Sequence, residues 1–298
     1  MATLASACGR PDPPSPPSPS PPPAVSITAA ASPELPALPP SAAVYPWTPT
    51  AKERLDGRFA APLAFHRVAA GDGTFGAFLR SLPLLPDGAP VVDYQGTPLY
   101  DAGHHPGIAA VVDLDVGTAN LQQCADAVIR LHAEWRYGRG DRALAYRSMS
   151  GAAIPYARYL AGEHAVSADG NGLAFVRRGG PARDDHKLFR SYLDDVFAWA
   201  NTRSLERDAA RVAFAELAAG DFFVMSGSPF GHTVLVLDVA RDERGRVALL
   251  LGQSFMPAQS FHVLRGSARE AWFIVEPGAS ELETPFWPAF PMEALRRL

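Results

Sequence analysis

The sequence has little cysteine and little lysine, and it has no long apolar run. Two of its 298 residues are cysteines, Cys8 and Cys124, and the only lysines are Lys52 and Lys187. Because Cys8 lies in a leader-like segment, Cys124 has no expected disulfide partner, and the fold does not rely on disulfides. No apolar run reaches the roughly 20 residues that a membrane-spanning helix needs. The formal net charge of −4 implies no polyanionic partner, so we expect no nucleic acid.

The first 44 residues have the composition of an export leader followed by a tether. Residues 4–8, Leu-Ala-Ser-Ala-Cys, resemble a bacterial lipobox, in which the cysteine is lipidated after cleavage. Either the start site is placed too late, or the resemblance is chance. Residues 11–44 are rich in Pro, Ser and Ala, which predicts a disordered, extended spacer. A lipid on Cys8 would make the chain an exported lipoprotein, periplasmic or at the outer membrane; without it the location stays open.

In the remainder of the chain, helical patterns precede strand patterns. Hydrophobic content of 47% is enough for a sizeable core, and we expect one domain over residues 45–298. Apolar periodicity predicts helices at 73–80, where Thr74 is the expected cap, from about residue 120 through Trp135, and at 185–203. Short apolar segments separated by turns predict strands at 108–114, 222–225, 232–239, 247–254, 261–264 and 271–275. The predicted class is α+β, with helices packed on a C-terminal antiparallel sheet.

Cys124 lies near the start of one predicted helix. Asn120, or alternatively Thr118, is a suitable N-cap, because its side-chain oxygen can accept a free backbone N–H. In the first turn, unpaired amides and the helix dipole favour a thiolate, which is the form that attacks carbonyls. The alternative is a small structural residue, since free cysteine is among the most buried residue types.

A predicted hairpin supplies a partner for this thiol. If the strands that begin at His232 and end near Gln253 pair around residues 243–244, Gln253 falls about opposite Val234. The amide oxygen would then hold one imidazole nitrogen and leave the other for the nucleophile. A helix packed on this sheet would bring Cys124 to His232, and either the Gln123 side chain or the Cys124 backbone N–H would supply an oxyanion donor.

Three short segments resemble the papain-like cell-wall hydrolases, namely the CHAP and NlpC/P60 families. They are Gln-Cys at 123–124, Gly-Asp-Phe-Phe at 220–223 and Gly-His-Thr-Val at 231–234, and the resemblance covers residues 115–256. It implies a papain-like fold and a thiol amidase or endopeptidase that acts on peptidoglycan or a related peptide, without a cofactor and as a monomer. In that interpretation Cys124 is the nucleophile, His232 the base and Gln253 the orienting residue.

Two rival interpretations remain. The same fold with an inactive site would bind a cell-wall peptide or glycan, and a purely structural lipoprotein domain would have no ligand site. The chain from residue 59 also resembles a bacterial family of unknown function that carries Asp-Leu-Gln-Gln-Cys-Ala-Asp and Gln-Ser-x-Met-Pro-Ala-Gln segments, matched here in part at 120–126 and at 253–259. That resemblance implies no activity.

The other polar candidates have mostly structural explanations. Arg130 could grip a substrate carboxylate, although a structural ion pair is favoured, and Ser254 and Gln259 could line the cleft rim or form a strand-end turn. Asp115 and Asp126 are expected to be helix-start charges. Four further candidates match no tight metal-ligand spacing, so we expect no metal: His104, His105, Asp113 and His132. The other histidines are expected at the surface or in satisfied hydrogen bonds: His66, His164, His186 and His262.

Overall fold

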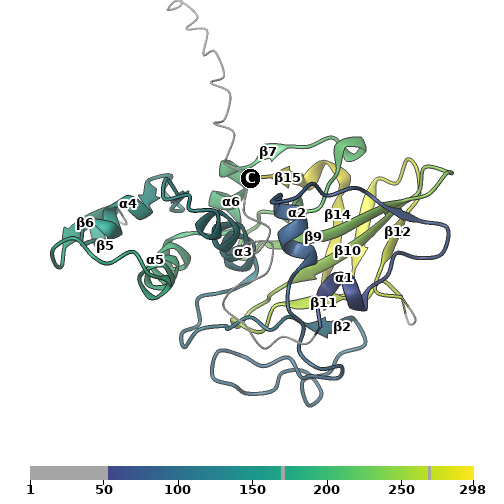
Figure 1. Cartoon of the computed structure of the whole chain (residues 1–298), viewed down its shortest axis with the longest axis horizontal. Coiled ribbons are helices and arrows are strands. Elements are labelled where there is room, and N and C mark those ends of the chain that lie inside the picture. Colours follow the sequence, from purple (N-terminus) through teal and green to yellow (C-terminus); the bar gives the residue numbers. More distant parts are fainter. Residues whose placement is uncertain (1–52, 169–171, 268–269) are drawn as a thin grey trace, which may run out of the picture. The chain divides into compact units, whose positions relative to one another are not determined.

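The computed structural model describes residues 53–168, 172–267 and 270–298, so the predicted leader, the lipidation of Cys8 and the spacer lie outside the described residues. Within these ranges the chain forms six α-helices (Figure 1). They are α1 (Leu55–Arg58), α2 (Phe75–Arg80), α3 (Cys124–Gly138), α4 (Tyr156–Leu160), α5 (His186–Trp199) and α6 (Thr202–Asp208). The 3-10 turns η3 (Phe214–Glu216) and η4 (Met292–Ala294) flank the sheet strands. None of these helices is long and apolar enough to cross a membrane.

The main sheet has nine strands, and every pairing between them is antiparallel. Its path is β2–β11–β10–β9–β8–β15–β7, with β1 paired to β9 and β12 paired to β10. These strands are β1 (His66–Arg67), β2 (Ile108–Val111), β7 (Ala210–Arg211), β8 (Phe222–Met225), β9 (His232–Arg241), β10 (Val247–Gln253), β11 (His262–Leu264), β12 (Phe273–Val275) and β15 (Leu295–Arg297). The predicted α+β class and the antiparallel sheet are confirmed.

The two faces of the sheet carry separate apolar clusters. Because side chains alternate along a strand, Leu235 and Leu237 of β9 lie on one face and Val234 and Val236 on the other. The first face, which we term the helix face, packs against the apolar side of α3. The second, the hairpin face, is covered by β13 (Glu281–Thr284) and β14 (Trp287–Pro291). The C-terminal hairpin and β15 were missing from the predicted elements, because their apolar residues are few and interrupted by Pro and Glu.

Helix α3 begins later than predicted. Its N-cap is Gln123 and its first residue is Cys124, so neither Asn120 nor Thr118 caps it. The side-chain oxygen of Asn120 instead accepts the backbone N–H of Ala258 at 2.7 Å. Asn120 is therefore used to join the segment before α3 to the loop after β10, and this leaves Cys124 closer to the helix end than expected.

The long helix predicted over 185–203 is two helices. Asp185 caps α5 by accepting the Leu188 N–H at 2.9 Å. The backbone is then extended at Ala200, and Asn201 caps α6 by accepting the Ser204 N–H at 3.1 Å. The apolar period of α5 runs up to Trp199 and Ala200 at the break, so periodicity alone did not show where this helix ends, whereas the spacing of Asn201 and Ser204 is a capping signal.

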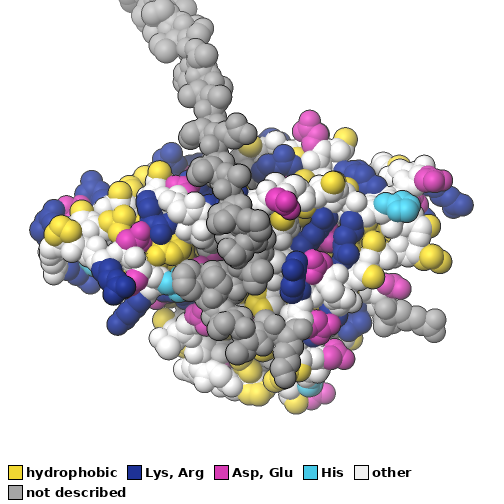
Figure 2. Space-filling model, in the orientation of Figure 1, with side chains coloured by type: hydrophobic (Ala, Val, Ile, Leu, Met, Phe, Trp, Pro, Cys, Tyr) yellow, Lys and Arg dark blue, Asp and Glu magenta, His cyan; other side chains and the backbone are white. Residues whose placement is uncertain are grey.

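The region between α3 and α5 is regular over most of its length. It contains two hairpins, formed by β3 (Ala145–Arg147) with β4 (Ala153–Pro155) and by β5 (Glu163–Ala168) with β6 (Gly172–Arg177). Helix α4 lies between them in the chain and packs with β5 and α5 (Figure 1). On the face seen in Figure 2, acidic and basic side chains are interspersed over the described residues.

Candidate functional site

A cavity of about 260 Å³ opens at the start of α3. Its walls come from residues 120–126, from the α5–α6 junction at 197–203 and from the loop 227–231 before β9, with Met256 closing one side. Segments distant in the sequence therefore converge on Cys124. A space of this size approaches the smaller ligand sites of proteins.

Cys124 lies at this cavity with only 6% of its surface exposed. Its sulfur is 4.0 Å from the carbonyl oxygen of Gly231, and the backbone N–H groups of Ala125 and Thr233 also lie within its hydrogen-bonding range. Burial, followed by the charge of Asp126, raises the pKa of the thiol to about 12, against the smaller lowering effect of these N–H groups. The predicted thiolate is therefore wrong for this state, because desolvation outweighs the helix terminus.

His232 and Gln253 lie side by side at the ends of β9 and β10. The Nε2 atom of His232 is 2.7 Å from the Oε1 atom of Gln253. Both side chains are buried, and burial lowers the pKa of the imidazole to about 4. The other ring nitrogen, Nδ1, is buried and has no hydrogen-bond partner. At neutral pH the structure thus holds a neutral imidazole with one nitrogen free.

Aromatic side chains enclose this imidazole. The ring of His232 has its centroid 4.8 Å from that of Phe255, 5.0 Å from that of Trp287 and 6.1 Å from that of Phe290. Trp287 and Phe290 belong to β14, the hairpin strand that the sequence analysis missed. These rings keep water away from the bond between His232 and Gln253, which strengthens that bond and explains the loss of imidazole basicity.

The predicted hydrogen bond between the thiol and the imidazole is not formed. His232 shares the hairpin face with Val234, whereas α3 packs on the helix face. The Cys124 sulfur instead lies against the backbone of Gly231 and Thr233, the residues on either side of His232. Folding therefore brings the thiol against the backbone on either side of His232, but the sulfur does not bond to the imidazole.

Asp126 lines the cavity, whereas His232 and Gln253 are not among its lining residues. The Oδ2 atom of Asp126 accepts the Gln123 N–H at 3.0 Å, while its Oδ1 atom is buried without a partner. Burial raises the pKa of this carboxyl to about 8. Asp126 is in the first turn of α3 as expected, but below pH 8 it is a neutral acid that can donate a proton to a bound group.

The predicted oxyanion donor Gln123 also lines the cavity. Its side-chain amide donates to the Asn120 side chain at 3.2 Å, which leaves the backbone N–H groups of Cys124, Ala125 and Thr233 as the nearer donors to the sulfur. Across the cavity stands Arg203, an exposed residue of α6 that was not among the predicted site residues.

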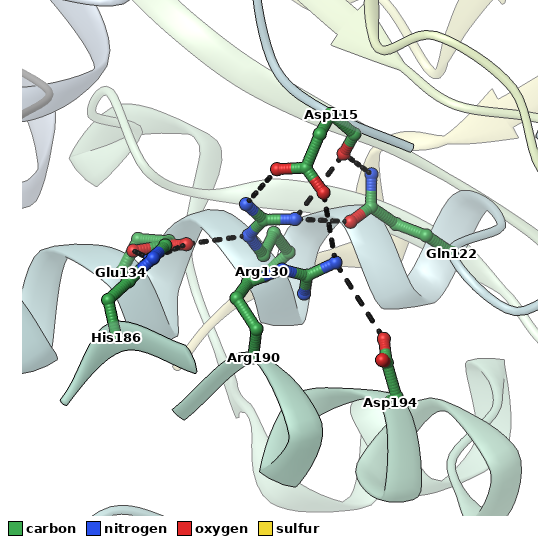
Figure 3. Close-up of polar contacts among 7 residues, drawn as sticks. All are labelled: Asp115, Gln122, Arg130, Glu134, His186, Arg190 and Asp194. Carbon is green, nitrogen blue, oxygen red and sulfur yellow. Dashed lines mark hydrogen bonds and ion pairs between the residues drawn. The ribbon is translucent and has the colours of Figure 1, made fainter. Parts of the chain in front are cut away.

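Arg130 lies away from the cavity, in a buried polar network (Figure 3). Its guanidinium donates to Glu134 at 2.8 Å, to Asp115 at 2.9 Å and to Gln122 at 2.7 Å. With 0% of its surface exposed, Arg130 cannot reach a substrate in the cleft. The structural ion pair was the correct alternative, and Asp115 is its partner rather than a helix-start charge.

The same network joins α3 to α5. Arg190 pairs with Asp115 at 3.2 Å and with Asp194 at 3.7 Å, and the His186 ring lies 3.0 Å from the Glu134 carboxylate (Figure 3). We call these seven residues, including Gln122 and Arg130, the Arg130 cluster. It fixes the position of α5, and therefore of the wall of the cavity that α5 and α6 supply.

Ser254 and Gln259 are buried rather than exposed on the cleft rim. The Ser254 hydroxyl donates to the Gln259 carbonyl oxygen at 2.8 Å, and the Gln259 side chain accepts the Tyr100 hydroxyl at 3.1 Å. The turn at the end of β10 explains both residues. Among residues 53–168, 172–267 and 270–298, no three His, Cys, Asp or Glu side chains gather in a way that could hold a metal ion.

Comparison with known proteins places the chain in a family. The fold is of the mixed α+β class, and unpartnered polar groups lie at and beside the start of α3. The chain belongs to the DUF4846 family, a domain of unknown function whose model matches residues 55–297. No curated protein and no solved structure shows a significant match.

Proposed function

We propose that this chain is a cysteine hydrolase of papain-like architecture that cleaves an amide in peptidoglycan or a related peptide. Cys124 is the nucleophile, His232 the general base and Gln253 the residue that orients the imidazole. One observation carries the proposal: Nε2 of His232 is held at 2.7 Å by Gln253 while Nδ1 is buried without a partner, and the Cys124 sulfur contacts the backbone of Gly231, the residue before His232. An unsatisfied buried nitrogen is costly and is concentrated at functional sites.

The proposed reaction has two steps. In the first, the Cys124 thiol gives its proton to Nδ1 of His232 while its sulfur bonds to the amide carbon. The C–N bond then breaks, and the imidazolium returns the proton to the departing amine. In the second step, water loses a proton to Nδ1 and attacks the thioester, which releases the carboxylic acid and restores the thiol.

This chemistry starts from a neutral pair. The pKa of Cys124 is raised to about 12 and that of His232 is lowered to about 4, so no thiolate–imidazolium pair exists before substrate arrives. The sulfur must also leave the Gly231 carbonyl oxygen, and the His232 imidazole must turn away from the rings of Phe255 and Trp287 to meet it. We propose that the substrate in the cavity drives this movement, because it displaces water and occupies the space next to the thiol.

The cavity suits a short peptide that carries a carboxylate. Arg203 supplies a positive charge at its edge, and the neutral Asp126 carboxyl can donate to a carbonyl or carboxylate oxygen within it. Residues Phe197 and Met256 provide apolar contact on the walls. If Cys8 is lipidated, the spacer at 11–44 would hold this site off a membrane and close to the cell wall.

The test is digestion of purified sacculi by the full chain, with release of soluble peptide fragments measured by liquid chromatography. Cys8→Ser serves as the background, so that Cys124 is the only thiol. We expect Cys124→Ala and His232→Ala to lose at least about 1,000-fold of the activity, since a nucleophile and its base act as one unit. Ser150→Ala, in a turn beyond α3, is the matched control. Equal digestion by the Cys124→Ala protein would end the proposal.

A second candidate is a binding module with an inactive site. The observation that favours it is the resting state of the thiol, which is buried, protonated and not bonded to the imidazole. Sedimentation of the protein with sacculi separates the two functions. A binding module would sediment equally as wild type and as Cys124→Ala while neither released fragments, whereas Arg203→Ala would weaken its sedimentation.

A further inference from the structure

The hydrogen bond between His232 and Gln253 is one part of a longer series of buried hydrogen bonds. The Nε2 atom of the Gln253 amide lies 3.3 Å from Nε2 of His262, and Nδ1 of His262 lies 2.9 Å from the carbonyl oxygen of Ser260. Strand β11 pairs with β10 so that His262 stands directly across from Gln253. All of these side chains are buried, and His262 has no surface exposed. This hydrogen-bond series therefore leads from the Ser260 carbonyl oxygen through His262 and Gln253 to His232.

The proton positions along this hydrogen-bond series follow from its end at the Ser260 carbonyl oxygen. A carbonyl oxygen only accepts hydrogen bonds, so Nδ1 of His262 must carry a proton and donate to Ser260. A neutral His262 then has a bare Nε2, which must accept from the Gln253 NH₂ group. That orientation turns the Gln253 oxygen toward His232, whose Nε2 must donate to it. His232 is left with a bare Nδ1, the atom that has no partner.

The opposite orientation is excluded by charge. If the Gln253 oxygen faced His262, both nitrogens of His262 would have to carry protons, and the ring would be a cation. A fully buried cation without a carboxylate is strongly disfavoured. The centroid of the Phe286 ring lies 5.7 Å from that of His262, and burial lowers the pKa of His262 to about 4. His262 is therefore neutral at pH 7, and one orientation remains.

We propose that His262 is a positioning residue that fixes the orientation of the Gln253 amide and, through it, the tautomer of His232 that can act as a base. This rests on the proposed function only for its catalytic consequence, since the tautomer itself is a property of the free protein. Without His262, the amide of Gln253 can invert, and His232 then places its proton on Nδ1, where it blocks proton transfer from the thiol.

Nitrogen NMR of the histidine rings tests this directly, because protonated and bare ring nitrogens resonate far apart. The chain has eight histidines, and the His232 signals are identified by their loss in His232→Gln. We expect wild-type His232 to be protonated at Nε2 and bare at Nδ1. His262→Gln keeps an acceptor for the Gln253 amide and a donor for Ser260, so it should retain this pattern.

The disruptive variant is His262→Phe, which fills the space but removes the acceptor. We expect His232 to show a mixture of tautomers in this protein. Adding Gln253→Leu to the wild type and to His262→Phe should abolish the difference between their His232 spectra. An unchanged His232 spectrum in His262→Phe, or a wild-type His232 protonated at Nδ1, would overturn the proposal. If His262→Phe fails to fold, a wild-type His232 protonated at Nδ1 would still overturn the proposal.

Activity provides the second measurement. If the chain hydrolyses sacculi, His262→Phe should lower kcat about 10- to 100-fold with KM within about twofold, as loss of an orienting partner does elsewhere. His262→Gln should recover most of that loss. Absence of hydrolysis in wild type would refute the proposed function and leave the tautomer result standing, so the two failures are distinguishable.

Discussion

Two buried polar arrangements in this molecule, the Arg130 cluster and the hydrogen-bonded groups around His232, differ in charge. In the Arg130 cluster every charged side chain has an oppositely charged partner within 3.7 Å. Around His232, by contrast, all the groups are neutral, and one basic nitrogen has no partner at all. The first arrangement holds helices together. The second keeps a buried hydrogen-bonding atom without a partner, in a residue whose neighbour in the chain contacts a thiol, which stability alone does not explain.

The largest effect is expected from breaking the charged arrangement. Arg130→Met keeps an unbranched, though shorter, side chain and leaves Glu134 as a buried charge that has lost its closest partner, with the His186 ring 3.0 Å away. We expect a loss of about 3–5 kcal/mol in the free energy of unfolding, measured by urea denaturation. Arg54→Met, which removes an exposed pair with Asp56, is the control and should cost about 0–1 kcal/mol. Similar losses in the two proteins would mean that the Arg130 cluster is not a structural clamp.

The next largest effect is expected from acid, which should lower the free energy of unfolding through the buried histidines. Burial lowers the pKa values of His232 and His262 to about 4 and that of His132 to about 3, all below the unfolded value near 6.5. Between pH 6.5 and 4 the unfolded chain therefore binds more protons, so stability falls as the pH falls. We expect about 2 kcal/mol per histidine between pH 7 and pH 5, read from urea midpoints at pH 7, 6 and 5. His232→Gln should flatten this dependence, and an unchanged slope would show that His232 is accessible to protons.

Asp126 should have a smaller effect on stability, and its contribution should change with pH in the opposite direction. Its pKa is raised from 3.8 to about 8, so between those values the folded state holds a proton that the unfolded state has lost. Stability contributed by Asp126 therefore falls as the pH rises through this window. Relative to wild type, Asp126→Asn should gain roughly 2 kcal/mol between pH 6 and pH 8. A constant difference between the two proteins would indicate an ordinary, charged carboxylate.

The sequence supports prediction of the class and of the sheet strands because their signals are local. Apolar segments bounded by turns marked β8 to β12, and Thr74 marked the start of α2, where it accepts the Ala77 N–H. The hairpin register also placed Gln253 near His232 correctly, since Gly252 pairs with Leu235. These features depend on alternation and turn chemistry, which a single sequence contains.

The remaining features depend on tertiary contacts. The thiolate expected of Cys124 followed from the helix end alone, and nothing in the sequence shows that residues 227–231 bury the sulfur. Likewise, His262 has an ordinary strand sequence around it, and its role follows only from the pairing of β11 with β10. The missed hairpin β13–β14 matters most, because Trp287 supplies part of the apolar surroundings that keep His232 neutral.

The most direct test of the central claim is capture of a covalent intermediate on Cys124. The Cys8→Ser protein is mixed with muropeptides and the reaction is quenched in acid. The protein is then digested, and the mass of the fragment that contains Cys124 is measured by mass spectrometry. The account predicts a thioester adduct on this fragment that forms early, decays as product appears and is absent from Cys124→Ala. Product formation without any adduct, or at the same rate in Cys124→Ala, would contradict it.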